Sequence, residues 1–169
     1  MRVGLVAVVA LCVACGYGFV QYDASLGDVR TVAIDTPRNE STEPGIEFLV
    51  ADSLRREFLR RGAVQLVDDP SSADLVLSGR IASLRESGQA FSSVVLTIEY
   101  RLTLALDLRA ARSDGSEVPL DSRAQRETES YLSSADLEAQ RKNRQEALRH
   151  LAALLAGRVY DSLYETLTP

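Results

Sequence analysis

The strongest constraint in this sequence is an apolar residue at every second position from 94 to 110, with mostly polar residues between them. Side chains of a β-strand point alternately to opposite faces, so a period of two predicts one long strand with one buried face. At about 3.3 Å per residue the strand would be about 56 Å long, several times the usual length, so we expect strong twist or a bulge. The apolar set comprises Val94, Leu96, Ile98, Tyr100, Leu102, Leu104, Leu106, Leu108 and Ala110.

The opposite face of this predicted strand is polar. A polar sheet face meets either water or the polar surface of a partner, and the alternation does not distinguish the two. The residues on this face are Thr97, Glu99, Arg101, Thr103, Asp107 and Arg109.

Shorter strands flank the long one. A run rich in β-branched residues predicts a strand at 29–34, and alternation predicts another at 74–85. Asp114-Gly115 predicts a hairpin turn, because these residues tolerate positive φ, and the chain then returns as a mostly polar strand at 117–129. A brief strand is also expected at 63–67.

Two helices are predicted. Apolar residues at helical spacing indicate a helix over 43–61, which Gly62 ends, and a long helix over 135–167 with a serine cap at its start. Each helix and each sheet has one apolar face to bury. The chain is therefore predicted to be an α+β two-layer sandwich, with about four strands in a mixed, mostly antiparallel sheet and both helices on one face.

The N-terminus has the pattern of an export signal. Arg2 supplies a positive charge, an apolar run extends from Val3 to Val13, and small Ala14 precedes Cys15. The run is too short to span a bilayer, which takes about 20 residues, but suits a signal peptide. We predict a lipoprotein signal peptide at 1–14 and acylation of Cys15.

Acylation of Cys15 would anchor the protein durably, because each buried CH₂ of an acyl chain contributes about 0.8 kcal/mol. Residues 15–28 combine glycine with polar residues and show no periodicity, so we interpret them as a lipidated tether to a single domain over 29–169. Gly16 indicates that the lipoprotein is located in the outer membrane, because Asp at that position favours retention at the inner membrane in many Gram-negative bacteria.

Redox and metal chemistry are disfavoured. Cys12 and Cys15 form a CxxC pair, but redox chemistry needs such a pair at a helix start within a folded core, not in an export segment. A zinc site would need further ligands, and His150 is the single histidine. We predict no metal and no cofactor.

Enzymatic and nucleic-acid functions are also disfavoured. The acidic net charge of −5, without a long basic tract, argues against a nucleic-acid partner. The sequence contains no P-loop, HExxH or GxSxG pattern to organise its polar residues. We therefore expect a protein that is not an enzyme.

Several short motifs follow one another in a specific order. They are Cys15-Gly16-Tyr17-Gly18-Phe19, Thr31-Val32-Ala33-Ile34, Asn39, Ser41, Glu43-Pro44-Gly45-Ile46-Glu47, Leu54-Arg55-Arg56-Glu57-Phe58, Ala73-Asp74, Leu77, Gly79, Ile81 and Glu99-Tyr100-Arg101. In this order they resemble the LptE family of lipopolysaccharide-assembly lipoproteins. The resemblance covers the chain from Cys15 to about Leu167.

The resemblance implies a lipid-anchored outer-membrane protein on the periplasmic side. It would sit as a plug inside the lumen of an LptD-like β-barrel, help that barrel to assemble and contact lipopolysaccharide. The candidate residues for facing the barrel are Thr97, Glu99, Thr103 and Asp107. Anionic phosphates need cations, for which the candidates are Arg80, Arg85, Arg101 and Arg109.

Two alternatives remain open. A stand-alone lipoprotein, acting as a binding or tethering module without a barrel, would have the same anchor and a small α+β domain. It would be marked by a concave apolar pocket with convergent polar groups, whereas a plug would show a broad convex polar sheet face. An anchored hydrolase would require buried titratable groups around His150 or a carboxylate pair.

Overall fold

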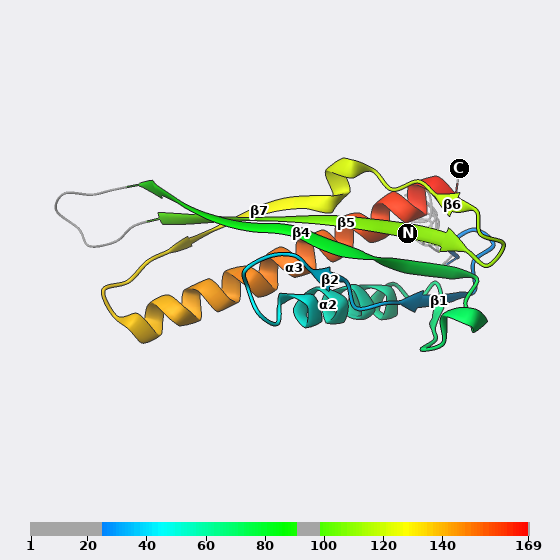
Figure 1. Cartoon of the computed structure of the whole chain (residues 1–169), viewed down its shortest axis with the longest axis horizontal. Coiled ribbons are helices and arrows are strands. Elements are labelled where there is room, and N and C mark those ends of the chain that lie inside the picture. The colour runs from blue at the N-terminus through cyan, green and yellow to red at the C-terminus, as the bar shows by residue number, and fades with distance from the viewer. Residues whose placement is uncertain (1–24, 91–98, 169) are drawn as a thin grey trace, which may run out of the picture.

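A computed structural model of the chain describes residues 25–90 and 99–168. A mixed sheet forms one layer, and the helices α2 (Ile46–Arg61) and α3 (Leu137–Leu167) pack beside each other against one of its faces (Figure 1). The predicted α+β sandwich with both helices on one face is confirmed. Neither helix is long and apolar enough to cross a membrane, and no other helix of the described residues is.

The sheet has more strands than predicted. In the described part it has seven, in the order β3-β1-β4-β5-β6, with β2 added beside β4 and β7 beside β5. The pairs β1–β3, β1–β4 and β2–β4 are parallel and the others antiparallel. The bounds are β1 (Thr31–Ile34), β2 (Arg38–Asn39), β3 (Gln65–Leu66), β4 (Leu75–Ala90), β5 (Glu99–Arg112), β6 (Glu117–Val118) and β7 (Arg126–Leu132).

The difference in strand number has a simple cause. Three of the strands are two residues long, which is too short to produce a periodic pattern in the sequence. The single strand predicted at 117–129 is instead interrupted by a 3₁₀ turn, η2 (Ser122–Gln125), which separates β6 from β7. A second 3₁₀ turn, η1 (Pro70–Ser72), precedes β4.

The long antiparallel pair β4–β5 is the backbone of the sheet. It runs from Leu75 opposite Arg112 to Ala90 opposite Glu99, with register shifts in β4 between Ile81 and Ser83 and again before Ala90. The expected bulge therefore lies in the partner of the alternating strand. The predicted apolar positions from 102 to 110 are all buried, while Val94, Leu96 and Ile98 lie outside the described residues.

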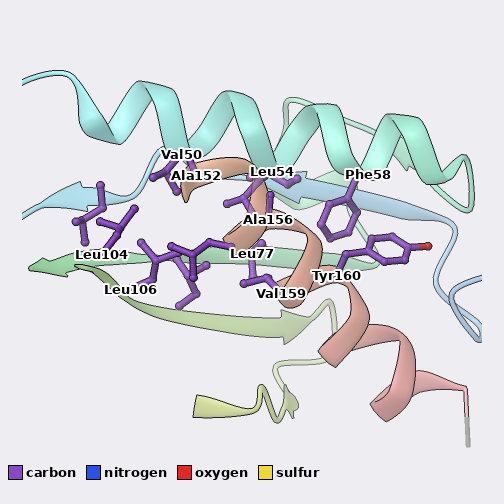
Figure 2. Packing of buried hydrophobic residues seen from close by; sticks show 14 of the residues in the cluster. Val50, Leu54, Phe58, Leu77, Leu104, Leu106, Ala152, Ala156, Val159 and Tyr160 are labelled. Atoms are coloured by element: carbon purple, nitrogen blue, oxygen red, sulfur yellow. The ribbon is translucent and has the colours of Figure 1, made fainter. Parts of the chain in front are cut away.

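The core lies between this pair and the two helices. Figure 2 shows Leu104 and Leu106 of β5 and Leu77 of β4 pointing toward side chains of α2 and α3. Phe58 of α2 meets Tyr160 of α3 edge to face, with ring centroids 5.0 Å apart. Full burial of one large apolar side chain contributes about 1.5–3 kcal/mol. Because one cluster contains many such side chains, it is the main source of stability.

The helix ends follow the sequence signals only in part. Gly62 adopts φ 68° and ends α2 as predicted, but the helix begins at Ile46, after Gly45 at φ 83°, rather than at residue 43. The predicted serine cap of the long helix is wrong. Asp136 caps α3 by accepting the N–H groups of Glu138 and Ala139 at 2.9 and 3.4 Å, because its carboxylate is the side chain placed one residue before the helix.

The packed part of the chain includes residues before Val29. Leu26 is fully buried, and Arg112 donates two hydrogen bonds to the Asp28 carboxylate at 2.8 and 2.9 Å. Gly27, at φ 60°, lies against the carbonyl of Leu167. The beginning of the described chain is thus tied to the end of β5 and to the end of α3.

Side chains satisfy backbone groups at the exposed edge of the sheet. Between β6 and β7, the Leu108 N–H donates to the Gln125 side chain at 2.6 Å. Along β7, the Thr128 N–H donates to the Glu127 carboxylate at 2.9 Å, and Asn143 of α3 donates to the Leu132 carbonyl at 2.8 Å. These bonds take the place of strand partners that the edge lacks.

We predict that Gly79→Ala destabilises the fold far more than Gly115→Ala. Both glycines have positive φ, 149° and 84°, but a Cβ at position 79 would lie 2.2 Å from the Asp107 carbonyl oxygen, whereas one at 115 meets nothing within 4 Å. Urea denaturation should show a loss of about 1 kcal/mol for Gly115→Ala, from backbone strain, and more than about 3 kcal/mol for Gly79→Ala. Equal losses would contradict the close approach of β5 to Gly79.

Candidate functional site

The sheet face turned away from the helices, called the outer face here, is open and polar. On β5 it carries Glu99, Arg101, Thr103, Asp107 and Arg109, which alternate with the buried apolar residues. The structure therefore brings the predicted polar residues of this strand together on one surface. Thr97 lies outside the described residues.

Arg80 and Arg85 of β4 also lie on the outer face. They are five residues apart, and in a regular strand an odd separation places side chains on opposite faces. The bulge between Ile81 and Ser83 shifts the alternation, so that Arg80 pairs with Asp107 and Arg85 with Thr103. All four arginines predicted to bind an anion thus share one face, in two groups.

The first group, called the distal patch, contains Arg85, Arg101, Thr103 and Thr128. Arg101 lies two positions along β5 from Thr103, the residue opposite Arg85, so the two arginines are diagonal neighbours. The hydroxyls of Thr103 and Thr128 are 3.2 Å apart across β5 and β7. Both arginines are exposed, and within residues 25–90 and 99–168 no carboxylate lies within ion-pair distance of either.

The second group surrounds Arg80. Its guanidinium donates to Asp107 at 2.9 Å and to Glu40 at 2.8 Å, and these bonds raise the pKa of Arg80, the bond to Asp107 most strongly. Asp107 is thus occupied by an arginine of its own chain. Arg109 lies nearby, and so does Arg38 of β2, which pairs in register with Arg80. Arg38 is not among the residues predicted from the sequence, because a two-residue strand gives no periodic pattern.

A cluster of ion pairs on the helix-covered side of the sheet, called the clasp, connects the strands that carry the distal patch. Arg144 of α3 donates to both oxygens of Glu43 at 2.9 and 2.7 Å and to Glu86 of β4 at 3.0 Å. Tyr131 of β7 donates to Glu86 at 2.5 Å and stacks on Tyr100 of β5. The clasp therefore joins α3, the segment before α2 and three strands at the end of the sheet near Arg85.

The clasp shifts the pKa values of its members. The hydrogen bonds from Arg144 lower the pKa of Glu43, and those bonds together with Glu86 raise the pKa of Arg144. Burial, followed by the hydrogen bond to Glu86, raises the pKa of the Tyr131 hydroxyl. Glu43 and Arg144 are therefore both charged at neutral pH, and Tyr131 keeps its proton.

His150 of α3 has a partner in β7, on the helix-covered side of the sheet. Its Nδ1 lies 3.0 Å from the Glu129 carboxylate, and more than half of its side chain is exposed. No three His, Cys, Asp or Glu side chains gather in a metal-binding arrangement in the described part of the chain. The absence of an enzymatic function stays a prediction.

Fold and surface together define a small α+β domain with one sheet face committed to the core and the other open and rich in arginine and hydroxyl groups. Solved structures share the fold. The rare lipoprotein B from Shewanella oneidensis is 18% identical over 81% of this chain and 96% of that chain, with a TM-score of 0.54. A minor lipoprotein from Acinetobacter baumannii is 14% identical over 80% of this chain and 93% of that one, with a TM-score of 0.51.

The sequence itself establishes the family. The family model LptE, described as lipopolysaccharide-assembly, matches residues 29–163, and the chain belongs to this family. The resemblance deduced from the motifs is therefore confirmed. A comparison with curated proteins gave no match.

The clasp predicts a specific response to acid. A carboxylate whose pKa is lowered by folding stabilises the fold above its unfolded pKa of about 4.5, and this contribution disappears as the pH falls through the folded pKa. Glu43→Gln should lower the free energy of unfolding by about 1–3 kcal/mol at pH 7. Between pH 5 and pH 3, the free energy of unfolding should fall less for this variant than for the wild type. Urea denaturation at each pH measures both effects.

The control is Glu165→Gln, which removes an exposed carboxylate that forms no ion pair in the described chain. It should follow the wild-type pH profile. The Glu43→Gln profile should be shallower without becoming flat, because Arg60 and Arg61 also lower the pKa of Glu57. An unchanged slope for Glu43→Gln would show that the clasp does not titrate with folding.

Proposed function

We propose that this protein is an outer-membrane lipoprotein that plugs an LptD-like β-barrel and takes part in lipopolysaccharide transport to the cell surface. Membership of the LptE family supports the assignment to lipopolysaccharide assembly. The observation that carries the proposal is the outer face, whose β5 side chains are mostly polar. The protein's own helices lie on the other face of the sheet (Figure 1).

The outer face suits the wall of a barrel lumen. The interior of a large membrane barrel is lined by polar side chains, so a plug has to present hydrogen-bonding groups rather than an apolar surface. Glu99, Thr103 and Thr128 supply such groups on neighbouring strands. In this proposal Glu99, Thr103 and the undescribed Thr97 face the barrel, with Asp107 acting mainly through Arg80.

The distal patch suits the phosphates of lipopolysaccharide. An arginine that already holds a carboxylate has few donors left, whereas an unpaired guanidinium offers two parallel N–H groups to a phosphate. Arg85 and Arg101 are unpaired within the described residues and adjacent to one another. In this proposal the two arginines of the distal patch contact the ligand, while its two threonines face the barrel. The protein acts by binding, without enzymatic chemistry.

A stand-alone lipoprotein would instead be expected to present a concave apolar pocket. The described chain has a hollow of about 520 Å³ between α2 and α3, lined by Phe48, Leu49 and Leu148 together with Asp52 and Arg149. Asp52 is paired with Arg56, so it does not point free into the hollow. The open polar outer face favours the plug.

The barrel partnership predicts selective cross-linking. A photo-reactive amino acid at Thr103, on the outer face, should cross-link the protein to a single large outer-membrane protein in the native host, with recovery in near-stoichiometric amount after mild detergent extraction. The same residue at Arg149, on the helical side, serves as the control and should give little of this product. Mass spectrometry identifies the partner.

Two outcomes would contradict the plug. Recovery of the protein alone, or with inner-membrane or peptidoglycan-associated partners, would favour the stand-alone lipoprotein. Equal cross-linking from Thr103 and Arg149 would show that the outer face has no special role.

The lipid anchor is tested separately at Cys15. The mature chain should begin at Cys15 and carry two or three acyl chains, which intact-protein mass spectrometry detects. Cys15→Ser should abolish acylation and release the protein from the membrane fraction, because anchoring by several acyl chains is lost. Cys12→Ser should leave both the acyl mass and the membrane association unchanged. A Cys15→Ser protein that keeps its acyl chains would overturn the assignment.

A further inference from the structure

The outer face contains a second feature, distinct from the distal patch. A hollow of about 600 Å³ opens where β2, β4 and β5 run side by side, and its rim carries Arg38, Arg80 and Arg109. Arg38, Arg80 and Asp107 form a row across the three strands, since Arg38 pairs with Arg80 and Arg80 with Asp107. The volume is within the range of about 300–1,000 Å³ typical of small-molecule sites.

The arginines at the hollow include a like-charged pair. Like charges on directly opposed strand residues are unfavourable, yet Arg38 lies opposite Arg80. Glu40 and Asp107 both bind Arg80, which leaves Arg38 and Arg109 without a carboxylate partner in the described chain. The guanidiniums of Arg38 and Arg109 can therefore bind a ligand, beside Arg80, which Glu40 and Asp107 hold in place.

The hollow also supplies hydrogen-bond acceptors. Asp35 and Thr36 line it beside Asp107, together with Ser78 and Gly79 of β4. A simple anion needs donors alone, whereas a sugar needs acceptors for its hydroxyl groups as well. Donors for an anionic group and acceptors for hydroxyls therefore occur in one concave site.

We propose that this hollow binds an anionic sugar, meaning a saccharide unit that carries a phosphate or a carboxylate. Arg38 and Arg109 hold the anionic group, while Asp35 and Thr36 accept hydrogen bonds from hydroxyls. The proposal deepens the proposed function, and rests on it, by giving the saccharide part of the ligand a site of its own. On the sheet, the nearest residues of the hollow and the distal patch, Asp107 and Thr103, are four residues apart along β5, or about 13 Å.

The test is a titration of the full mature lipoprotein, kept in a detergent without a sugar headgroup. Glucose 6-phosphate and glucuronate are the probes, and glucose and inorganic phosphate are the reference compounds. Isothermal titration calorimetry or saturation-transfer NMR measures the dissociation constants. We expect both probes to bind more tightly than either reference compound.

The decisive comparison uses two double variants with the same change in net charge. Arg38→Ala with Arg109→Ala should raise the dissociation constant of glucose 6-phosphate by at least about tenfold, because charge-assisted hydrogen bonds are lost. Arg123→Ala with Arg149→Ala removes two exposed arginines elsewhere that form no ion pairs in the described chain, and should change it less than about twofold. Thermal melting verifies that both variants stay folded.

Three results would overturn the proposal. Inorganic phosphate binding as tightly as glucose 6-phosphate would reduce the hollow to a simple anion site. Equal weakening in both double variants would indicate general electrostatic attraction, and no measurable binding of either probe to the wild type would remove the site altogether.

Failure of this inference is distinguishable from failure of the proposed function. Recovery of the barrel with the wild-type protein tests the plug without reference to the hollow. A wild type that recovers a barrel but ignores both probes keeps the plug and loses the sugar site. A wild type that binds the probes through Arg38 and Arg109 but recovers no barrel keeps the sugar site as a property of the chain and loses the plug.

Discussion

The antiparallel pairing of β4 with β5 is the constraint on which the rest of this structure depends. Every second side chain of β5 enters the core, so the intervening ones are forced onto a surface that no helix of the protein covers. A one-residue slip would exchange the two faces completely. The pairing therefore fixes both the hydrophobic core and the open polar face of the sheet, and the remaining elements pack around it.

Strong periodicity made the largest elements predictable from sequence. The alternation that ends at Ala110 gave β5 and its buried face, and the stripe that includes Leu54 and Phe58 gave α2 and its packing side. Gly62 marked the end of a helix because it can adopt positive φ without strain. Family membership followed from short motifs in order. Among them, Asn39 of β2 donates to the Glu43 carbonyl in the loop before α2 and to the Glu47 carboxylate in the first turn of α2.

The remaining features depend on contacts between distant parts of the chain. Nothing local indicates the bulge after Ile81, yet it decides that Arg80 and Arg85 share a face. The clasp joins Arg144 to Glu43 across 101 positions, and Arg38 becomes a neighbour of Arg80 only through a two-residue strand. Arginines counted as equivalent in the sequence thus differ in the fold, since some are neutralised by carboxylates and others are not.

The hydrogen bonds along the edge of β7 also affect how the protein behaves without a partner. An exposed strand edge is a template on which a second chain can add its own strand, and growth from such edges leads to aggregation. Here the Thr128 N–H and the Leu132 carbonyl are already engaged by Glu127 and Asn143, so two of the contacts that would seed such growth are blocked. The molecule can therefore expose a wide sheet face while the edge of β7 is less able to pair with a second copy of the chain.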